Sequence, residues 1–316
     1  MINFLHTFSP SAILLTIGPL TVYWYGLFMV LSILAALGIT FYLAKFHKIK
    51  RDLIFDLAFW LIIGGLIGAR IYDVFLQLPY YLNHPFQVFA VWKGGLAIHG
   101  AILAGLLVVW LFAKKHHLAF WQLIALIAPG LALGQAIGRW GNYFNQELFG
   151  LPTALPWGIP IEVINRPLEY LNVNFFHPTF LYESIGSFLI FIILTALTLV
   201  FFTKIKKSAA ETSRLSLEDS RDAAEKINAE TAASKTPTAN RRFYVWISAL
   251  YMILYSILRL SLEFIRLDET PLLFGWRWPQ IISFGLIIFF ILILIFYPYD
   301  NQLAKIKNEL ENETKK

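Results

Sequence analysis

Three arginines lie inside or directly beside long apolar runs, where a charged side chain is unusual. Arg139 follows the run 118–138, Arg259 lies within the run 243–263, and Arg266 comes just after it. An ionisable group near the centre of a membrane-spanning helix costs at least about 2.5–3.5 kcal/mol, so it normally faces a partner or a wet cavity. The forked guanidinium group matches phosphate oxygens bidentately. An arginine cluster at this depth therefore indicates a binding site for the phosphate of a phospholipid.

The segment around Arg139 has a second, simpler interpretation. If this segment is helical, Arg139, Asn142 and Gln146 share one helix face at i, i+3 and i+7. The same spacing is equally typical of an arginine and asparagines that cap a helix end near lipid headgroups.

Arg259 and Glu263 are separated by one helical turn, and taken alone they are best explained as an ion pair that neutralises itself in the bilayer. The charge count argues for more. Glu263 and Glu147 cannot neutralise Arg139, Arg259 and Arg266 together, so we expect surplus positive charge that requires an anion.

His99 is the candidate proton acceptor. It lies at the start of an apolar run and is flanked by Gly94, Gly95 and Gly100, which we expect to leave room for a ligand. An imidazole with an ordinary pKa near 6.5 suits proton transfer at neutral pH, although a lone histidine in such a setting is more often a structural hydrogen-bonding group. The sequence contains no cysteine, which excludes disulfides, thiolate metal sites and a cysteine nucleophile in this chain.

The elements that carry these residues are membrane spans. Hydrophobic residues make up 58% of the 316 and charged residues 15%, whereas a soluble domain carries about 25% charged residues. A soluble enzyme or transcription factor is therefore excluded. Stretches long enough to span a bilayer lie at 21–44, 53–76, 96–113, 118–138, 179–202, 243–263 and 279–298. The sequence predicts an all-α polytopic membrane protein with seven transmembrane helices and a small extracytoplasmic cap.

The distribution of positive charge predicts the orientation. Of the 26 lysines and arginines, 19 follow spans one, three, five and seven. The positive-inside rule then places the N-terminus outside and the C-terminus in the cytoplasm. The other seven cations fall at the opposite ends: Arg70, Lys93, Arg139, Arg166, Arg259, Arg266 and Arg277. The positive charge of the chain is therefore explained by membrane topology, and we expect no nucleic-acid partner.

The composition divides the chain into five parts. Residues 1–20 form an amphipathic lead-in outside the membrane, and 21–203 hold spans one to five with the outer cap 139–178. Residues 204–242 are rich in Ala, Ser, Thr, Lys and Glu, which predicts a disordered or loosely helical cytoplasmic loop. Residues 243–299 hold spans six and seven, and 300–316 form a charged cytoplasmic tail.

Six motifs together resemble the bacterial prolipoprotein diacylglyceryl transferase family, and they occur in the same order along the chain. They are Trp24-Tyr25-Gly26, the Gly-Gly-x-x-x-His-Gly that ends at Gly100, the run 138–150, His177-Pro-Thr-Phe-Leu-Tyr-Glu183, Arg259-x-x-x-Glu263-Phe-x-Arg266 and Gln280-x-x-Ser283. The resemblance implies seven helices with the N-terminus outside, in a bacterial cytoplasmic (inner) membrane, which agrees with the charge count.

The resemblance also implies a reaction. The family moves the diacylglyceryl group of phosphatidylglycerol onto the cysteine thiol of a prolipoprotein lipobox in the signal peptide, forming a thioether and releasing glycerol phosphate. The absent cysteine is then intelligible, because the nucleophile arrives with the substrate. No metal or other cofactor is expected.

The resemblance assigns roles to residues of this chain. Arg139 and Arg259 would hold the phosphate, and His99 would be the base or a donor that orients the lipid. A second set would bind substrate or, in the case of Glu263, orient an arginine: Tyr25, Asn142, Asn145, Glu147, Gly150, Tyr255, Glu263 and Arg266.

Two features depart from the family. Many members carry a basic residue after the glycine at 150, where this chain has Leu151, so a further phosphate or peptide contact there is not expected. The long loop 204–242 resembles an insertion. Because it lies across the membrane from the predicted site, deletion of 208–238 is expected to leave activity intact.

Other functional classes make different demands on the sequence. A phospholipid or anion transporter would use the same arginines but needs polar residues continuing toward the cytoplasm, whereas spans five and seven are nearly all apolar there. An outer-leaflet phosphoethanolamine transferase usually needs a metal, and no Asp/His cluster lies at that depth. A structural scaffold gives no reason for surplus arginines.

Overall fold

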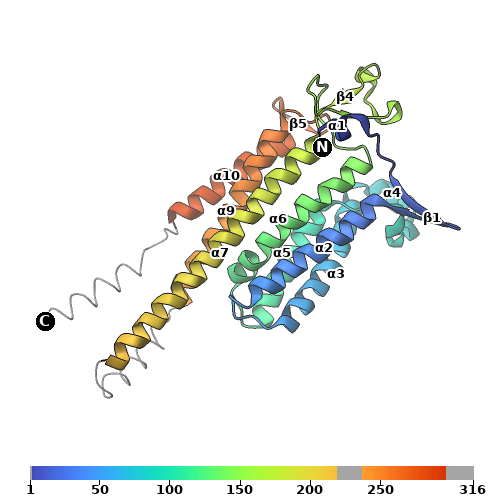
Figure 1. Cartoon of the computed structure of the whole chain (residues 1–316). Helices are drawn as coiled ribbons and strands as arrows, with labels where there is room; N and C mark the ends of the chain where they lie inside the picture. Colours follow the sequence, from blue (N-terminus) through green and yellow to red (C-terminus); the bar gives the residue numbers. More distant parts are fainter. Residues whose placement is uncertain (1, 219–236, 297–316) are drawn as a thin grey trace. The chain divides into compact units, whose positions relative to one another are not determined.

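The computed structural model of the chain describes residues 2–218 and 237–296, and these are mainly helical (Figure 1). The α-helices are α1 (Ile2–Thr7), α2 (Trp24–Ala44), α3 (Arg51–Leu76), α4 (Leu78–Asn83), α5 (Ile98–Lys115), α6 (Phe120–Phe144), α7 (Thr179–Glu218), α9 (Pro237–Glu263) and α10 (Trp278–Phe296). Short 3₁₀ helices are η1 (Pro85–Phe89), η2 (Val91–Lys93), η3 (Val163–Asn165) and η4 (Leu168–Tyr170). Three two-stranded antiparallel sheets pair β1 (Ile13–Ile17) with β2 (Leu20–Tyr23), β3 (Ile159–Pro160) with β4 (Phe175–Phe176), and β5 (Leu272–Leu273) with β6 (Trp276–Arg277).

Among the described residues, seven helices are long and apolar enough to cross a membrane, which confirms the predicted fold class. They are α2, α3, α5, α6, α7, α9 and α10. Their flanks expose large apolar side chains, such as Phe284 and Phe289 of α10, 60% and 55% exposed. A surface of this kind is stable only against lipid.

Two helix ends differ from the sequence prediction. α6 continues to Phe144, so Arg139 and Asn142 lie within the helix and not in the cap. α7 continues to Glu218 and α9 begins at Pro237, beyond the predicted span ends at 202 and 243. The described parts of the loop 204–242 are therefore helical, one of the two states predicted for it. The rest of that loop, 219–236, and the predicted tail 300–316 lie outside the described residues.

The chain divides into two compact units. The first consists of residues 1–39 and 127–316, and the second of residues 40–126. α2 and α6 each contribute to both units, since the division falls within these helices.

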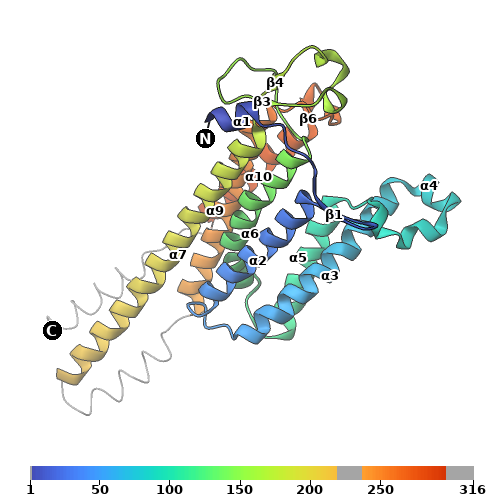
Figure 2. The same cartoon turned by 45° about the vertical axis from the view of Figure 1, so that its right-hand side comes forward.

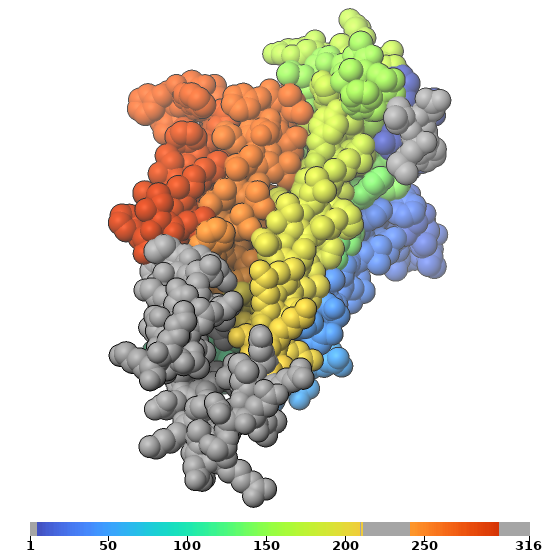
Figure 3. Space-filling model, turned by 60° about the vertical axis from the view of Figure 1, so that its left-hand side comes forward, coloured from blue at the N-terminus to red at the C-terminus, as the bar shows by residue number. Residues whose placement is uncertain are grey.

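In the first unit, α9 packs against both α7 and α10 (Figures 1 and 2). Figure 3 shows the surface of these three helices, in yellow, orange and red. The first part of α2 packs closely on α6, because a Cβ at Gly134 would lie 3.2 Å from the Ser32 carbonyl oxygen. Gly134 thus allows a close approach of these two helices. Ser184 of α7 donates a hydrogen bond to the Ala136 carbonyl of α6 at 2.7 Å.

A small cap follows α6 and covers the start of α7 in Figure 3. Its strands β3 and β4 pair in register Ile159 with Phe176. A compact apolar core holds it together, and this core also includes the N-terminal helix α1: Leu5, Tyr143, Phe149, Ile159, Ile161, Phe176 and Phe180. The cap is therefore a built element attached to the ends of α6 and α7.

In the second unit, α3 and α5 pack along their length. Gly68 and Gly100 make this contact possible, because a Cβ on Gly100 would lie 2.1 Å from the Gly68 carbonyl oxygen. Gly64 similarly faces Val108. The segment between α3 and α5 folds as α4, η1 and η2.

Candidate functional site

Arg139 lies in the last two turns of α6 and makes an ion pair with Glu183, which lies in the second turn of α7. Its Nη1 also donates to the Asn142 side-chain oxygen at 3.3 Å, one turn further along α6. The Tyr255 side chain of α9 also interacts with Arg139. This guanidinium group thus joins three helices, and its side chain is still 21% exposed.

Glu183 is shared with a second arginine. Arg266 Nη1 lies 3.5 Å from the second carboxylate oxygen of Glu183, and Arg266 Nε donates to Asp268 at 2.6 Å. The side chains of Glu183 and Arg266 are only 2% and 4% exposed. Burial alone would raise the pKa of Asp268, but the hydrogen bond and charge of Arg266, with other guanidinium groups nearby, lower it below its ordinary value.

Glu263, the last residue of α9, is also shared. Its Oε2 lies 2.9 Å from Nη2 of Arg259, and its Oε1 lies 3.1 Å from Nε of Arg277. The Glu263 side chain is fully buried, whereas those of Arg259 and Arg277 are 19% and 18% exposed. The predicted Arg259–Glu263 ion pair is therefore present, as half of a larger arrangement.

We call these seven side chains the arginine cluster; its members are Arg139, Glu183, Arg259, Glu263, Arg266, Asp268 and Arg277. The charge count from sequence was incomplete, because it considered only Glu263 and Glu147 and omitted Glu183 and Asp268. Each described arginine of the cluster has a carboxylate partner. Four guanidinium groups nevertheless share three carboxylates, so the cluster keeps one formal positive charge.

One guanidinium nitrogen of the cluster differs from the others in the described residues. Arg259 Nη1 is buried and has no hydrogen-bond partner among the described residues. A buried donor without a partner costs about 1–3 kcal/mol, which suits a position where a ligand oxygen binds.

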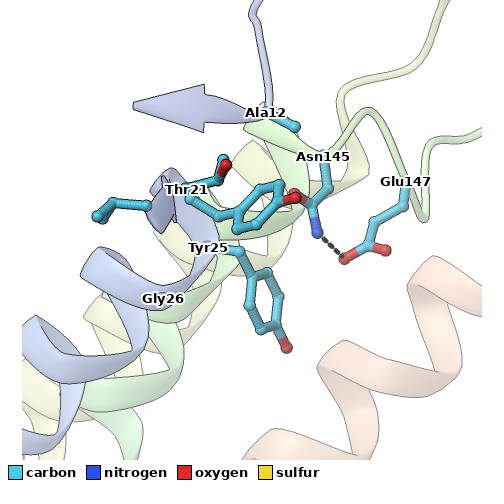
Figure 4. A pocket seen from close by; sticks show the side chains of 8 residues that line it. Ala12, Thr21, Tyr25, Gly26, Asn145 and Glu147 are labelled. Carbon is cyan, nitrogen blue, oxygen red and sulfur yellow. Dashed lines mark hydrogen bonds between the residues drawn. The ribbon is translucent and has the colours of Figure 1, made fainter. Parts of the chain in front are cut away.

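Beside the cluster lies an open groove of about 690 Å³, lined by Ala12, Thr21, Val22, Tyr23, Tyr25, Gly26, Asn145 and Glu147. Figure 4 shows the Asn145 amide pointing to the Glu147 carboxylate, while Thr21 and Tyr25 come from β2 and the first turn of α2. Asn142 donates to the same Glu147 oxygen at 2.7 Å. The hydrogen bonds from Arg139 to Asn142 and from Asn142 to Glu147 therefore connect the cluster to the groove.

Tyr25 reaches the groove because α6 carries glycine where the two helices meet. A Cβ at Gly141 would lie 2.9 Å from the Tyr25 ring. The structure thus brings together the predicted residues Tyr25, Asn142, Asn145 and Glu147, next to Arg139.

Gln146 does not continue the helix face of Arg139 and Asn142, because α6 ends at Phe144 and Gln146 has a φ of 50°. It is buried and ties three segments together. Its amide donates to the Pro10 carbonyl at 2.9 Å and its oxygen accepts from the Glu162 backbone at 2.7 Å.

Gly150 has a packing role in this structure. Its N–H donates to the His177 carbonyl at 2.9 Å, and a Cβ would lie 2.8 Å from the Ile265 carbonyl oxygen. Close backbone contact here fixes the segment that carries Arg266, with which Gly150 forms a β-bridge.

His99 belongs to the second unit, so its part in the reaction stays a prediction from sequence. It lies in the first turn of α5, is exposed, and its ring centroid is 5.9 Å from that of Tyr72. The expectation that the glycines around it leave open space was wrong for Gly95 and Gly100. Gly100 packs on α3, and a Cβ at Gly95 would lie 2.5 Å from the Arg70 guanidinium group.

Arg70 itself has a structural role. Its guanidinium group donates to backbone carbonyls of the segment 87–95, among them Gly94 at 2.6 Å and Gly95 at 2.8 Å. Asp73 accepts a hydrogen bond from the Tyr81 hydroxyl at 2.7 Å, and this bond is the main reason why the pKa of Tyr81 lies above its ordinary value. This predicted outer cation therefore organises the loop between α3 and α5.

Sequence reasoning missed Glu183 and Asp268 as members of the cluster, and it named Arg277 among the outer cations without giving it a role in the site. Glu183 closes the motif that begins at His177, so its carboxylate at the start of an apolar helix was an available signal. Asp268 and Arg277 gave no periodic signal, since both lie in the segment between α9 and α10. Within residues 2–218 and 237–296, no group of three or more His, Asp or Glu side chains is placed to hold a metal ion.

Comparison with known proteins gives a consistent result. A family model described as prolipoprotein diacylglyceryl transferase matches residues 12–214 and 232–296. A phosphatidylglycerol–prolipoprotein diacylglyceryl transferase of Synechocystis sp. is 37% identical over 280 residues, which cover 89% of this chain and 87% of the relative. A protein of the same name from Nostoc sp. is 49% identical over 189 residues, 60% of this chain and 67% of that protein.

Proposed function

The chain belongs to the prolipoprotein diacylglyceryl transferase family, and we propose that it transfers the diacylglyceryl group of phosphatidylglycerol to the lipobox cysteine thiol of a prolipoprotein signal peptide. It is a multi-pass membrane protein. The products are a thioether-linked lipoprotein precursor and glycerol phosphate.

The observation that carries this proposal from the structure is the arginine cluster. It holds one more guanidinium group than carboxylates, and it lies where α6, α7 and α9 meet. A phosphodiester carries one negative charge, which matches the surplus. Glu147 is a further carboxylate, but it is exposed and reaches the cluster only through Asn142, so solvent screens its charge.

The reaction balances as a displacement at carbon. The cysteine sulfur forms a bond to the glyceryl carbon that bears the phosphate, and the bond from that carbon to the phosphate oxygen breaks. The electron pair stays with the departing glycerol phosphate, and the thiol proton passes to a base. His99 is our candidate for that base, as the resemblance in sequence implies.

Two groups of the cluster suit the leaving phosphate. Arg139 and Arg259 are the partly exposed arginines of α6 and α9, and the unpartnered Nη1 of Arg259 offers a donor. Donors placed where charge develops in the transition state are typically worth about 10²–10³ in rate. Arg266, being buried, would position Glu183 and not contact the lipid.

The groove beside the cluster suits the rest of the headgroup. Its polar side presents Asn145 and Glu147, which are acceptors and donors for hydroxyl groups, and its other side presents Tyr25. We place the terminal glycerol of the lipid here, with the acyl chains between the spans.

We further propose that the chain lies in the bacterial cytoplasmic membrane, with its N-terminus and the cap outside and its C-terminus in the cytoplasm. The charge distribution supports this orientation, because the cap end of the spans carries few lysines. Prolipoproteins present their lipobox at that face.

A direct test incubates the purified protein with phosphatidylglycerol vesicles and a lipobox peptide, followed by mass spectrometry of the peptide. The peptide with cysteine should gain the mass of one diacylglyceryl group, and the same peptide with serine should not. Absence of any gain from correctly folded protein would contradict the proposal. Transport of an anion across the vesicles without such a gain would favour a transporter.

A further inference from the structure

Glu263 divides its two oxygens between two arginines, and only one of these was expected at the site. Oε2 pairs with Arg259 at 2.9 Å, and Oε1 pairs with Arg277 at 3.1 Å. Because Glu263 is fully buried, water cannot substitute for either partner. The ion pair between Arg277 and Glu263 therefore affects how the Glu263 carboxylate is positioned against Arg259.

Arg277 also fixes the segment that links α9 to the β5–β6 hairpin. Its Nη1 donates to the carbonyls of Glu263 at 3.1 Å and Arg266 at 2.7 Å, and its Nη2 donates to the carbonyl of Asp268. Its Nε lies 2.9 Å from the Thr270 hydroxyl oxygen. One guanidinium group thus holds the backbone on both sides of Arg266.

Arg277 changes the charge of the cluster as well. Besides Glu263, it lies 3.8 Å from a carboxylate oxygen of Asp268, the partner of Arg266. Without Arg277, three guanidinium groups would face three carboxylates, and the surplus positive charge would disappear. Glu263 would then be free to pair with Arg259 alone and draw its donors away from a ligand.

We infer that Arg277 is a positioning residue of the lipid site: by occupying Glu263 and Asp268, it keeps the surplus positive charge of the cluster and leaves Arg259 able to bind an anionic phospholipid. The inference rests on the proposed function for the identity of that lipid. Arg277 need not contact the substrate, since it acts through the two carboxylates.

A purely structural role for Arg277 makes a different prediction, and a charge-restoring variant separates the two. R277Q removes the positive charge and the carbonyl hydrogen bonds. R277Q/D268N also lacks those hydrogen bonds, but it removes one carboxylate and so restores the surplus positive charge of the cluster. If Arg277 only anchors the backbone, the second substitution brings no recovery.

The experiment measures kcat and KM for phosphatidylglycerol in wild type, R277Q, R277K and R277Q/D268N. We expect R277Q to lower kcat/KM by about 10²-fold, the cost typical of a small misplacement of a reacting group, with much of the loss in KM. R277K, which keeps the charge without the fork, should recover part of the loss, and R277Q/D268N should recover the KM component.

The matched control is R166Q. Arg166 likewise donates to two backbone carbonyls, those of Ile161 at 2.8 Å and Leu171 at 2.7 Å, but it lies in the cap away from the cluster. It should leave KM near the wild-type value. Wild-type kinetics of R277Q, or a double variant no better than R277Q, would overturn the inference.

A second readout is independent of catalysis. Native mass spectrometry of each purified variant, with equal phosphatidylglycerol and phosphatidylcholine, reports which lipid is retained. Wild type and R277Q/D268N should prefer the anionic lipid, and R277Q should not. If the wild-type protein shows no transfer but the variants show this lipid preference, the proposed function is wrong and the role of Arg277 stands. If R277Q prefers the anionic lipid as the wild type does, Arg277 does not have this role.

Discussion

Glu183 Oε2 lies 3.5 Å from Nη1 of Arg266, and both side chains are almost completely buried. The other oxygen of Glu183 is paired with Arg139. One carboxylate at the start of α7 therefore connects α6 to the segment that follows α9. This shared carboxylate makes the cluster a single unit, because loss of one pairing changes the partners of the next.

The substitution E183Q tests this connection. Removing one partner of a buried ion pair typically costs about 3–5 kcal/mol, because the opposite charge is left uncompensated. We expect a loss of this size in the free energy of unfolding, measured by thermal or denaturant unfolding in detergent, together with loss of transfer activity. E169Q, in the cap, is the control and should unfold like wild type.

Arg139→Lys and Arg259→Lys test the phosphate clamp. Each keeps the charge but loses the forked donors, so we expect binding of phosphatidylglycerol to weaken less than turnover falls. The corresponding alanine variants should lose about 10²–10³ in rate, as for other transition-state donors. Initial rates of peptide lipidation measure the effect, and the unfolding temperature identifies variants that are misfolded. Wild-type turnover in a folded alanine variant would remove that arginine from the mechanism.

Local spacing placed most of the residues within the helices correctly, with Gln146 as an exception. The apolar runs predicted seven spans, and the i, i+3 relationship predicted the contact between Arg139 and Asn142. Pairings between distant segments were missed, because no periodicity connects Glu183 to Arg266. Gln146 was misplaced for a local reason, since its positive φ follows a helix end that the spacing could not reveal.

Gly150→Ala should destabilise the cap. An added Cβ would lie 2.8 Å from both the Ile265 carbonyl oxygen and the His177 Cβ, and overpacking of this kind costs about 1–3 kcal/mol. The strain falls on the segment that carries Arg266, so activity should fall with stability. Gly285→Ala in α10 is the control, because nothing lies within 4 Å of its added Cβ. Equal unfolding temperatures for the two variants would contradict the packing role of Gly150.

His47 gives a prediction for pH. This residue between α2 and α3 is buried, and burial lowers its pKa from 6.5 to about 4. Between these two pH values the unfolded chain binds more protons than the folded chain. The contribution of His47 to the free energy of unfolding is therefore fully present above pH 6.5 and is lost as the pH is lowered toward 4. Each tenfold difference in proton affinity is worth about 1.4 kcal/mol.

The unfolding temperature of the wild type, measured across this pH range, should fall as the pH is lowered. The unfolding temperature of H47F should change less with pH. H117N, at an exposed position, should keep the wild-type slope; if H47F keeps it too, another group is responsible.

The segment between α7 and α9 should be dispensable for catalysis. The family match stops at residue 214 and resumes at 232, so 215–231 has no counterpart in the family model. Glu183 and Glu263 lie at the opposite ends of these helices from the segment, and at 1.5 Å per residue the helical path from Glu183 to Glu218 is about 50 Å. We therefore expect that replacing 219–231 with a glycine–serine stretch of equal length leaves kcat and KM near wild type. Membrane insertion is checked by protease protection. A well-inserted variant with greatly reduced transfer would show that this segment acts on the site across the length of α7, a role that none of the cluster's contacts requires.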